Sequence, residues 1–236
     1  MLCPMALPQA VATNRSYPHD LTDRLLAGMS PDARRDIVAG SRQRPLRAGQ
    51  LLIRTGEPAE QLFLLRKGRV LFSRLAHTGR EIVMGILVPG DVFGIGTILT
   101  QPVNYIGTAK SLESGEALVW TRQTMQELTA EHPQLSENAL YVALRYVAQF
   151  AERHERLITA TAEQRLARSL VRLGVRTGTR KLSGVEVRIK NDQLASLADV
   201  SSFTASRLLK RWERDGVITK SRGIVHIICP EKLLLD

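Results

Sequence analysis

The chain has 236 residues, 44% of them hydrophobic, and 33 Lys and Arg side chains against 23 Asp and Glu give it a formal net charge of +10. This length and hydrophobic content predict a globular protein of two domains and exclude intrinsic disorder. The excess of basic residues favours a polyanionic partner. No apolar run in the sequence approaches the roughly 20 residues that a membrane-spanning helix needs.

The N-terminal residues show no pattern of a packed element, and we expect residues 1–25 to form a flexible segment. The first residues are mildly apolar, but Pro4 and Pro8 interrupt them and no positive charge precedes them, so they do not predict a secretory signal. Cys3 and Cys229 lie at opposite ends of the sequence and predict neither a disulfide framework nor a Cys-x-x-Cys motif. A cytoplasmic protein is expected.

Residues 26–132 are predicted to form a β-roll that acts as a sensor domain. Short apolar runs alternate with turns here, and Gly68, Gly79 and Gly90 mark turns at an even spacing. Several short strands at regular intervals favour a small roll or barrel over alternating strand and helix units. Such a roll encloses either a ligand pocket or only a hydrophobic core.

Residues 133–161 are predicted to form one long helix for dimerisation. Its apolar positions alternate at intervals of four and three residues, the spacing of a coiled-coil seam, and such a helix is roughly 40 Å long. We expect the seam to pair two copies of the chain; the alternative is that this stripe packs on its own roll. The expected seam consists of Leu140, Leu144, Val147, Ala151, His154 and Ile158.

Residues 162–236 are predicted to hold a helix-turn-helix unit followed by a wing. A short helix begins near Asn191, a tight turn follows at Asp199, and Ser201 or Ser202 is the N-cap of a second helix. The apolar residues of this second helix recur at i, i+3, i+4 and i+7, as in a helix packed on one side. They are Ala205, Leu208, Leu209 and Trp212.

The polar face of the second helix is the expected reader of the DNA major groove. Arg207 is the best candidate for a bidentate contact with guanine, and Ser206 is a lesser base contact. Ser202, Thr204 and Lys210 are expected to contact phosphates.

Beyond Gly216, two short apolar runs flank a turn that contains glycine, which predicts a hairpin like the wing of a winged helix. Lys220 and Arg222 lie at its tip, where we expect them to contact backbone phosphates. The alternative for the whole unit is an ordinary helical hairpin with a solvated basic face.

The basic charge is concentrated in the last third of the chain. Residues 164–236 contain 15 Lys and Arg against 7 Asp and Glu, whereas residues 1–163 contain 18 against 16. A basic surface confined to one module indicates polyanion binding. Membrane-surface binding is less well supported, because no aromatic-rich amphipathic stripe accompanies the charge. The predicted partner is duplex DNA with an inverted-repeat site, which a homodimer would read.

The order of roll, long helix and winged helix-turn-helix resembles the family of the cyclic-AMP receptor protein and the fumarate-nitrate regulator (Crp/Fnr), over nearly the whole chain. The resemblance is carried by Gly56-Glu57, Leu62–Leu65 with Lys67–Val70, Pro89–Gly94 and Ser206–Leu209. It implies an α+β fold with an N-terminal jelly-roll like a cyclic-nucleotide-binding domain. It also implies a bacterial transcription regulator that works as a dimer and contacts RNA polymerase.

Two positions depart from the cyclic-nucleotide binders that the chain resembles. A Glu that holds the ribose is replaced by Ile95, and an Arg that holds the cyclic phosphate is replaced by Gly107. Burying a phosphate without a guanidinium is costly, so we do not expect cyclic AMP to bind in the usual way. The expected effector pocket is apolar and is lined by Phe93, Gly94, Ile95, Ile98 and Phe150.

Other cofactors are not predicted. An iron-sulfur cluster needs about four thiolates, and the sequence has two cysteines. Haem needs an axial ligand, for which His77 or His154 could serve, but a lone histidine is a weak motif. A haem-dependent gas sensor therefore stays a minor alternative, and no metal site is expected.

A third departure concerns the reading head, that is, the residues at the start of the second helix that are expected to contact bases. The resemblance implies a Glu there, three residues before the Ser-Arg pair. Phe203 stands there. Phe cannot accept a hydrogen bond from cytosine but can touch a thymine methyl, so a different half-site is expected. Alternatively, Phe203 folds inward as part of the core.

The sequence contains no constellation typical of an enzyme. It has no Walker loop, no Gly-x-Ser-x-Gly elbow and no His pair at zinc spacing, and its five histidines are scattered. We therefore expect a regulator in which the roll senses a signal and the long helix relays it. The alternative from another class is a ligand-binding roll whose winged helix mediates protein contacts.

Overall fold

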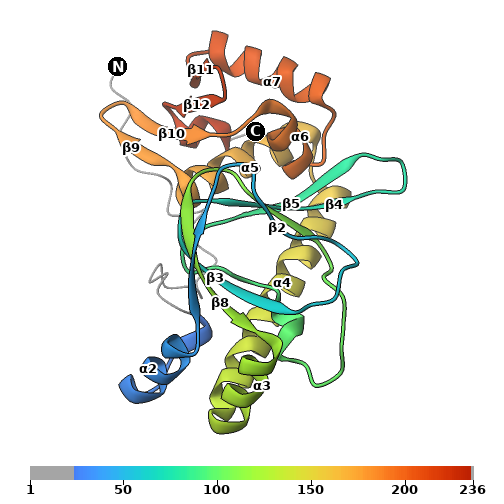
Figure 1. The fold of residues 1–236 in the computed structure, drawn as a ribbon. Coiled ribbons are helices and arrows are strands. Elements are labelled where there is room, and N and C mark those ends of the chain that lie inside the picture. The colour runs from blue at the N-terminus through green and yellow to red at the C-terminus, as the bar shows by residue number, and fades with distance from the viewer. Residues whose placement is uncertain (1–23, 235–236) are drawn as a thin grey trace. The chain divides into compact units, whose positions relative to one another are not determined.

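The computed structural model describes residues 24–234, and Figure 1 shows their helices and strands. The described chain divides into two compact units, one ending at Ala151 and the other beginning at Glu152. This boundary falls inside the predicted dimerisation helix instead of at either of its ends. The fold is α+β, as the sequence predicts, with a strand-rich first unit and a mixed second unit.

The first unit contains a roll of two antiparallel four-stranded sheets, with strand orders β1-β8-β3-β6 and β2-β7-β4-β5. Gly68, Gly79 and Gly90 have φ angles of 90°, 77° and 88°, so each occupies the left-handed region that its turn requires. The predicted turns are confirmed. The strands are β1 (Arg42–Leu46), β2 (Leu51–Ile53), β3 (Gln61–Lys67), β4 (Val70–Leu75), β5 (Glu81–Leu87), β6 (Val92–Phe93), β7 (Thr108–Ser111) and β8 (Gly115–Thr121).

Strand β3 explains why the sheet that contains it carries a core on both faces. Successive side chains of a strand point to opposite faces, and four consecutive residues of β3 are buried. Phe63 and Leu65 join the cluster between the two sheets, whereas Leu62 and Leu64 join a second cluster on the outer face. A continuous apolar run is what a strand buried on both faces needs.

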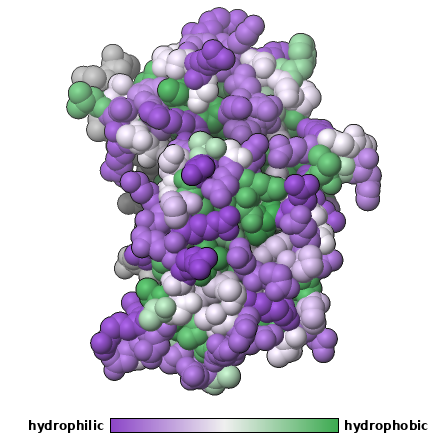
Figure 2. Space-filling model, viewed as in Figure 1, coloured by the Kyte–Doolittle hydropathy of each residue, from purple (hydrophilic) through white to green (hydrophobic). Residues whose placement is uncertain are grey.

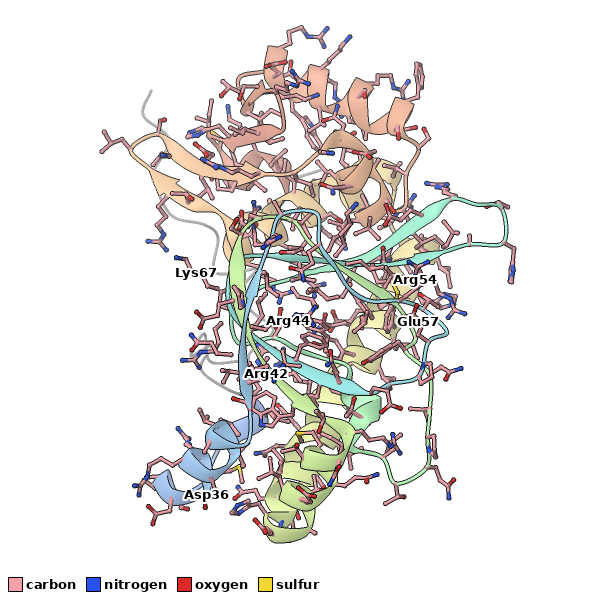
Figure 3. The ribbon with its side chains drawn as sticks, in the orientation of Figure 1. Asp36, Arg42, Arg44, Arg54, Glu57 and Lys67 are labelled. Atoms are coloured by element: carbon pink, nitrogen blue, oxygen red, sulfur yellow. The ribbon has the colours of Figure 1, made fainter. Side chains whose placement is uncertain are left out.

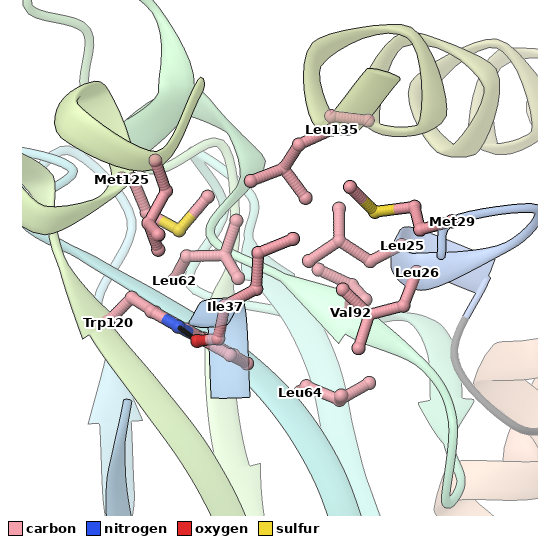
Figure 4. Close-up of a cluster of buried hydrophobic side chains, with 12 residues drawn as sticks. Leu25, Leu26, Met29, Ile37, Leu62, Leu64, Val92, Trp120, Met125 and Leu135 are labelled. Carbon is pink, nitrogen blue, oxygen red and sulfur yellow. Dashed lines mark hydrogen bonds between the residues drawn. The ribbon is translucent and has the colours of Figure 1, made fainter. Parts of the chain in front are cut away.

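Helices cover this outer face, as Figure 4 shows. They are η1 (Arg24–Leu26), α2 (Pro31–Ala39), α3 (Arg122–Glu131) and the first turns of α4 (Pro133–Thr159). The indole of Trp120 is fully buried and donates a hydrogen bond of 2.7 Å to the carbonyl of Ile37, which joins β8 to α2. Neither α2 nor α3 was predicted from the sequence.

The N-terminal boundary needs a correction. Leu25, which was assigned to the flexible segment, is fully buried in the outer cluster, as is Leu26 with 1% exposure. Ordered structure therefore begins before residue 26, because η1 fills the space between the sheet and α4. The rest of the predicted flexible segment, residues 1–23, lies outside the described residues.

Helix α4 packs on the roll through one stripe of side chains. Leu135, Ala139 and Val142 are buried, and the hydroxyl of Tyr146 donates a 2.7 Å hydrogen bond to the carbonyl of Val92 in β6. These positions are three or four residues apart and so share one face of the helix. The predicted seam residues are not among them, so the alternative that the seam packs on its own roll is wrong.

The second unit holds the predicted winged helix-turn-helix. It includes α5 (Ala162–Thr177), β9 (Thr179–Lys181), β10 (Gly184–Arg188), α6 (Asn191–Leu197), α7 (Ser202–Arg214), β11 (Ile218–Ser221), β12 (Ile224–Ile227) and η3 (Pro230–Leu233). The strands form one antiparallel sheet in the order β11-β12-β10-β9. The hairpin of β9 and β10 was not predicted.

Local sequence determines where the recognition helix begins. Ser201 is the N-cap of α7, because its hydroxyl accepts a 3.0 Å hydrogen bond from the amide of Thr204. This settles the choice between Ser201 and Ser202. The predicted apolar stripe of this helix is confirmed, since Ala205, Leu208, Leu209 and Trp212 are all buried. No helix in the described part of the chain is both long and apolar enough to span a bilayer.

Candidate nucleic-acid interface

The exposed face of α7 carries the predicted base-reading residues. Arg207 and Lys210 are exposed and Ser206 is half-buried, whereas the opposite stripe is in the core. Figure 2 shows mainly hydrophilic residues on the viewed surface of α7. The helix therefore presents a polar, cationic face beside an apolar anchor, as a helix that enters the major groove must.

Phe203 projects from the N-terminal turn of α7. Its side chain is 79% exposed, so the alternative that it folds inward as core is wrong. An aromatic side chain that is exposed to this extent contributes little to the hydrophobic core of its own unit. The geometry leaves it available to touch another molecule.

The hydroxyl-bearing residues near Phe203 differ in their surroundings. Ser202 is exposed. Thr204 is half-buried, and its hydroxyl lies 2.8 Å from that of Ser201, within the cap of the helix. Ser202 is thus the freer of the two predicted phosphate contacts, because the hydroxyl of Thr204 already has a partner in the cap.

Two basic residues that were not predicted from the sequence extend the cationic face of α7. Arg211 and Arg214 line one hollow together with Arg207 and Lys210. Arg211 also forms an ion pair with Glu163 of α5. Spacing could have identified Arg211 and Arg214, since they lie four and seven residues after Arg207 on the same helix.

The wing forms a second hollow with the start of α6. Lys220 and Arg222, the predicted phosphate contacts, line it together with Lys190 and Asn191. The amide of Lys220 donates a 3.1 Å hydrogen bond to the carboxylate of Glu213, which ties β11 to α7. Lys190 was not predicted, because only the fold brings it beside the wing, about thirty residues further along the chain.

The predicted effector residues do not line one pocket. Phe93 is buried between the two sheets and stacks on Phe63 with ring centroids 4.7 Å apart. Ile95 and Ile98, at the ends of η2 (Ile95–Ile98), pack against the outer cluster instead. Gly94 has a φ of 82°, and a Cβ there would lie 2.3 Å from the carbonyl oxygen of Gln61. Phe150 is 40% exposed on α4. This prediction is therefore corrected: neighbouring residues of β6 and η2 serve two separate cores.

The two positions at which the family resemblance implies a ribose-binding Glu and a phosphate-binding Arg carry uncharged residues. A Cβ on Gly107 would lie 2.5 Å from Cζ of Phe72, so the phenyl ring takes the space of any longer side chain. Ile95 packs on the outer cluster. These residues supply neither a carboxylate for a ribose nor a guanidinium for a phosphate.

Cationic side chains of the roll have partners of their own. Figure 3 labels Arg44 on β1 and the neighbours Arg54 and Glu57 that follow β2. Arg44 donates a 3.4 Å hydrogen bond to Gln61 and lies 5.8 Å from the centroid of the Phe63 ring. Arg54 and Glu57 form an ion pair of 3.4 Å.

Tyr105 joins the loop before β7 to β3. Its hydroxyl accepts a 2.8 Å hydrogen bond from the amide of Gln61 and donates one of 2.9 Å to the carbonyl of the same residue. Burial raises the pKa of the Tyr105 hydroxyl, because the charged phenolate would lose its hydration. This tyrosine is therefore a neutral structural link.

The predicted seam of α4 is exposed along its length. Leu140 is 61% exposed, Leu144 57%, Val147 62% and Ile158 74%, and Ala151 and His154 are exposed as well. Four large apolar side chains in one stripe of a helix are uncommon on a monomer's surface, where such patches mark interaction sites. His77, the other histidine considered as a haem ligand, is exposed in the turn between β4 and β5. No group of three or more His, Cys, Asp or Glu side chains that could hold a metal occurs within residues 24–234.

Comparison with known protein families identifies both parts of the chain. Residues 43–132 match the cyclic nucleotide-binding domain, and residues 164–235 match the Crp-like helix-turn-helix domain. Together the two matches cover more than half of the chain. The chain belongs to the Crp/Fnr family. Its two domains occur in the order that the sequence predicts, and the family consists of transcription regulators, not enzymes.

Characterised relatives of this Crp/Fnr chain are similar over most of its length. It is 26% identical over 225 residues to the transcriptional activator protein Anr of Pseudomonas aeruginosa. The aligned region covers 94% of this chain and 91% of the relative. It is 27% identical to a CRP-like cAMP-activated global transcriptional regulator of Mycobacterium tuberculosis, over 78% of this chain and 83% of the relative.

Solved structures of the family share the fold. The c-di-GMP responsive global regulator CLP of Xanthomonas campestris superposes with a TM-score of 0.74 at 19% identity, over 84% of this chain and 99% of CLP. FixK2 of Bradyrhizobium japonicum gives a TM-score of 0.70 at 17% identity, over 82% of this chain and 95% of FixK2. The architecture is therefore retained at low sequence identity.

Proposed function

We propose that this Crp/Fnr regulator is a homodimer that binds an inverted-repeat DNA site and reads each half-site with one copy of α7. The observation that carries the proposal is the exposed polar face of α7 beside a buried apolar stripe. Two such helices about 34 Å apart would enter successive major grooves on one side of the duplex.

The proposed interface residues divide into base contacts and phosphate contacts. Arg207 contacts guanine through its two-pronged guanidinium, with Ser206 as a lesser contact, and Phe203 touches a thymine methyl. Ser202, Thr204 and Lys210 contact phosphates near the reading head, and Lys220 and Arg222 contact them from the wing. Phosphate contacts fix the register of the protein on the duplex, and base contacts specify the sequence.

Dimerisation is supported by the two stripes of α4. One stripe packs on the roll through Leu135, Ala139 and Val142, whereas the seam from Leu140 to Ile158 is exposed. Heptad spacing on the exposed stripe suits a second copy of the same helix. A twofold dimer then matches the symmetry of an inverted repeat.

The proposed signal acts on the roll and is not cyclic AMP bound in the usual way. Support comes from Ile95 and Gly107, which supply no charged group, and from the Phe72 ring that fills the space over Gly107. Relatives respond to different ligands: one is cAMP-activated and CLP is c-di-GMP responsive. A signal would shift the population between dimers that fit DNA and dimers that do not.

No iron-sulfur cluster or haem is part of the proposal. A cluster needs about four thiolates, and the sequence has two cysteines. Of these, Cys229 is buried and Cys3 lies outside the described residues. His77 and His154 are each exposed and belong to different units. RNA polymerase is the proposed protein partner of the DNA-bound dimer.

The test is selection of bound sequences from random duplex DNA with the purified protein and no added ligand. We expect an enriched inverted repeat with a guanine in each half-site. Arg207→Ala should lose discrimination at that guanine, by about 1 to 3 kcal/mol per contact. Arg180→Ala, an equal loss of charge at an exposed residue of β9, is the matched control and should retain the repeat.

Two results would contradict the proposal. If no sequence is enriched with or without cell-extracted small molecules, the winged helix does not read DNA, and a protein-interaction module becomes the better explanation. If a repeat is enriched only by protein reconstituted with haem, the signal belongs to the gas-sensor alternative.

A further inference from the structure

The turn between α6 and α7 contains a strained residue. Asp199 has a φ of 53°, and it is the one non-glycine residue with a positive φ among residues 24–234. Only a small share of non-glycine residues adopt this left-handed conformation, although Asp and Asn do so more readily than others. Glycine would adopt this backbone conformation at a lower cost in free energy. We therefore expect the carboxylate of Asp199 to make an interaction that glycine could not make.

The carboxylate of Asp199 is held by Arg153, which belongs to the last turns of α4. Nε of Arg153 lies 2.7 Å from Oδ2 of Asp199, and Nη2 lies 2.6 Å from Oδ1. A two-pronged Arg–carboxylate pair of this kind is both strong and directional. The two side chains are 16% and 24% exposed, so solvent screens the pair only partly.

The same guanidinium also binds the end of α6. Nη2 of Arg153 donates a 2.9 Å hydrogen bond to the carbonyl of Ser196. The last carbonyls of a helix lack partners within the helix and attract positive charge. Arg153 thus contacts both the end of α6 and the residue that turns the chain toward α7.

A second arginine supports the turn from α5. Arg165 donates hydrogen bonds of 3.1 Å and 3.2 Å to the carbonyls of Ala198 and Asp199, and one of 2.7 Å to that of Ala160. These acceptors are backbone atoms, which any residue at 198 or 199 would provide. Of the two arginines, it is Arg153 that contacts the carboxylate of Asp199.

We propose that the Arg153–Asp199 pair positions the recognition helix for DNA binding. The pair connects the turn before α7 to the last turns of α4, so a movement of those turns would displace the N-terminal end of α7. Ser201, the N-cap of α7, lies two residues after Asp199, and Phe203 follows in the first turn. This inference rests on the proposed function, because it names the contact by which α4 would control the reading head.

Substitutions in the full-length protein test the pair against the operator found by selection. Arg153→Met removes the guanidinium, and Asp199→Gly removes the carboxylate while it keeps a residue that tolerates positive φ. The matched control is Arg156→Met, one turn of α4 further on, where the arginine pairs with Glu152 of its own helix.

We expect Arg153→Met and Asp199→Gly each to weaken operator binding by about tenfold, and the double variant to lose no more than either single variant, because both remove the same interaction. Affinity for random duplex and its dependence on salt should not change, since neither residue is among the proposed phosphate contacts. Arg156→Met should bind the operator like the original protein. Hydrogen exchange of the amides from residue 199 to residue 204 should accelerate in Arg153→Met and not in Arg156→Met.

Unchanged operator binding in folded Arg153→Met, or losses that add in the double variant, would overturn the inference. An equal loss of operator and random-duplex affinity would do so too, because it would indicate general destabilisation. If Arg153→Met does not fold, Arg153→Lys keeps the charge without the two-pronged geometry, and operator affinity equal to that of the original protein would then refute the pair. If the original protein selects no operator, the proposed function fails, whereas the hydrogen-exchange comparison still decides whether Arg153 orders the turn.

Discussion

At the scale of single residues, the reading head combines a cation, a hydroxyl and an aromatic ring on one exposed helical face. Arg207 can form two hydrogen bonds with guanine, and no other base offers the same pair of acceptors in the major groove. Phe203 offers no hydrogen bond, and 79% of its side chain is exposed before any partner binds. Its proposed contribution comes from apolar contact with a methyl group.

Replacement of this aromatic residue should change the preferred base. Phe203→Glu introduces an acceptor for the amino group of cytosine, so we expect the preferred base at one half-site position to change from thymine to cytosine, by about 1 to 3 kcal/mol. Selection from random duplexes with the variant checks this. Phe203→Leu, which keeps an apolar contact, should retain thymine. An unchanged preference in Phe203→Glu would show that residue 203 does not face a base.

The wing should affect affinity without affecting sequence preference. Arg222→Ala removes one proposed phosphate contact, so we expect weaker binding to all duplexes and a salt dependence of log K that is less steep by about one unit. Titrations at several salt concentrations, with operator and with random duplex, measure both quantities. Lys181→Ala, at an exposed residue of β9, is the control with the same charge loss. A loss confined to the operator would mean instead that Arg222 reads a base.

At the scale of elements, α4 carries two stripes, one buried and one exposed. The stripe of Leu135, Ala139 and Val142 is buried against the roll. The seam is exposed, with 57% of Leu144 and 62% of Val147 accessible. A single helix can thus belong to its own roll and still offer a surface to a second copy.

A charge in the seam should therefore separate the dimer. We expect Leu144→Glu to give a monomer at micromolar concentration, because two carboxylates would face each other across the seam, and to bind a single half-site weakly. Sedimentation measures the association state. Gln149→Glu adds the same charge at a half-buried position outside the seam and should stay dimeric. A dimeric Leu144→Glu protein would place the dimer interface elsewhere.

At the scale of the whole molecule, charge and function are divided between two units. Most of the net positive charge lies in the residues after 163, which hold the winged helix-turn-helix, whereas the roll is nearly neutral. Basic charge is what DNA binding needs. Helix α4 contributes residues to both units.

The roll should be indifferent to cyclic AMP. A ligand that binds only the folded protein stabilises it by about 2.7 kcal/mol at one hundred times its Kd. We expect no such increase in the melting temperature at millimolar cyclic AMP, because Ile95 and Gly107 supply no charge for the ribose or the phosphate. Thermal unfolding with and without the nucleotide is the measurement, and 5′-AMP is the control ligand. A rise in melting temperature with cyclic AMP alone would contradict the proposal.

Local patterns in the sequence determined much of this protein. Hydrophobic spacing predicts the long helix. It also predicts the buried stripe of α7, because that side of the helix must leave water. Glycine spacing predicts the turns at Gly68, Gly79 and Gly90, because their backbone conformation suits glycine. The polar face of α7 and the tip of the wing follow from the same local rules.

Tertiary structure alone decided which distant residues meet. Phe93 and Ile95 are neighbours in sequence, but they belong to cores on opposite faces of one sheet, so an apolar segment did not make a pocket. Lys190 lines one hollow with Lys220 of the wing, and Arg153 pairs with Asp199. Each of these arrangements joins segments that are tens of residues apart. No local pattern contains such pairings, because they depend on the tertiary fold. The spacing of residues along the chain indicates only the preferences of single helices, strands and turns.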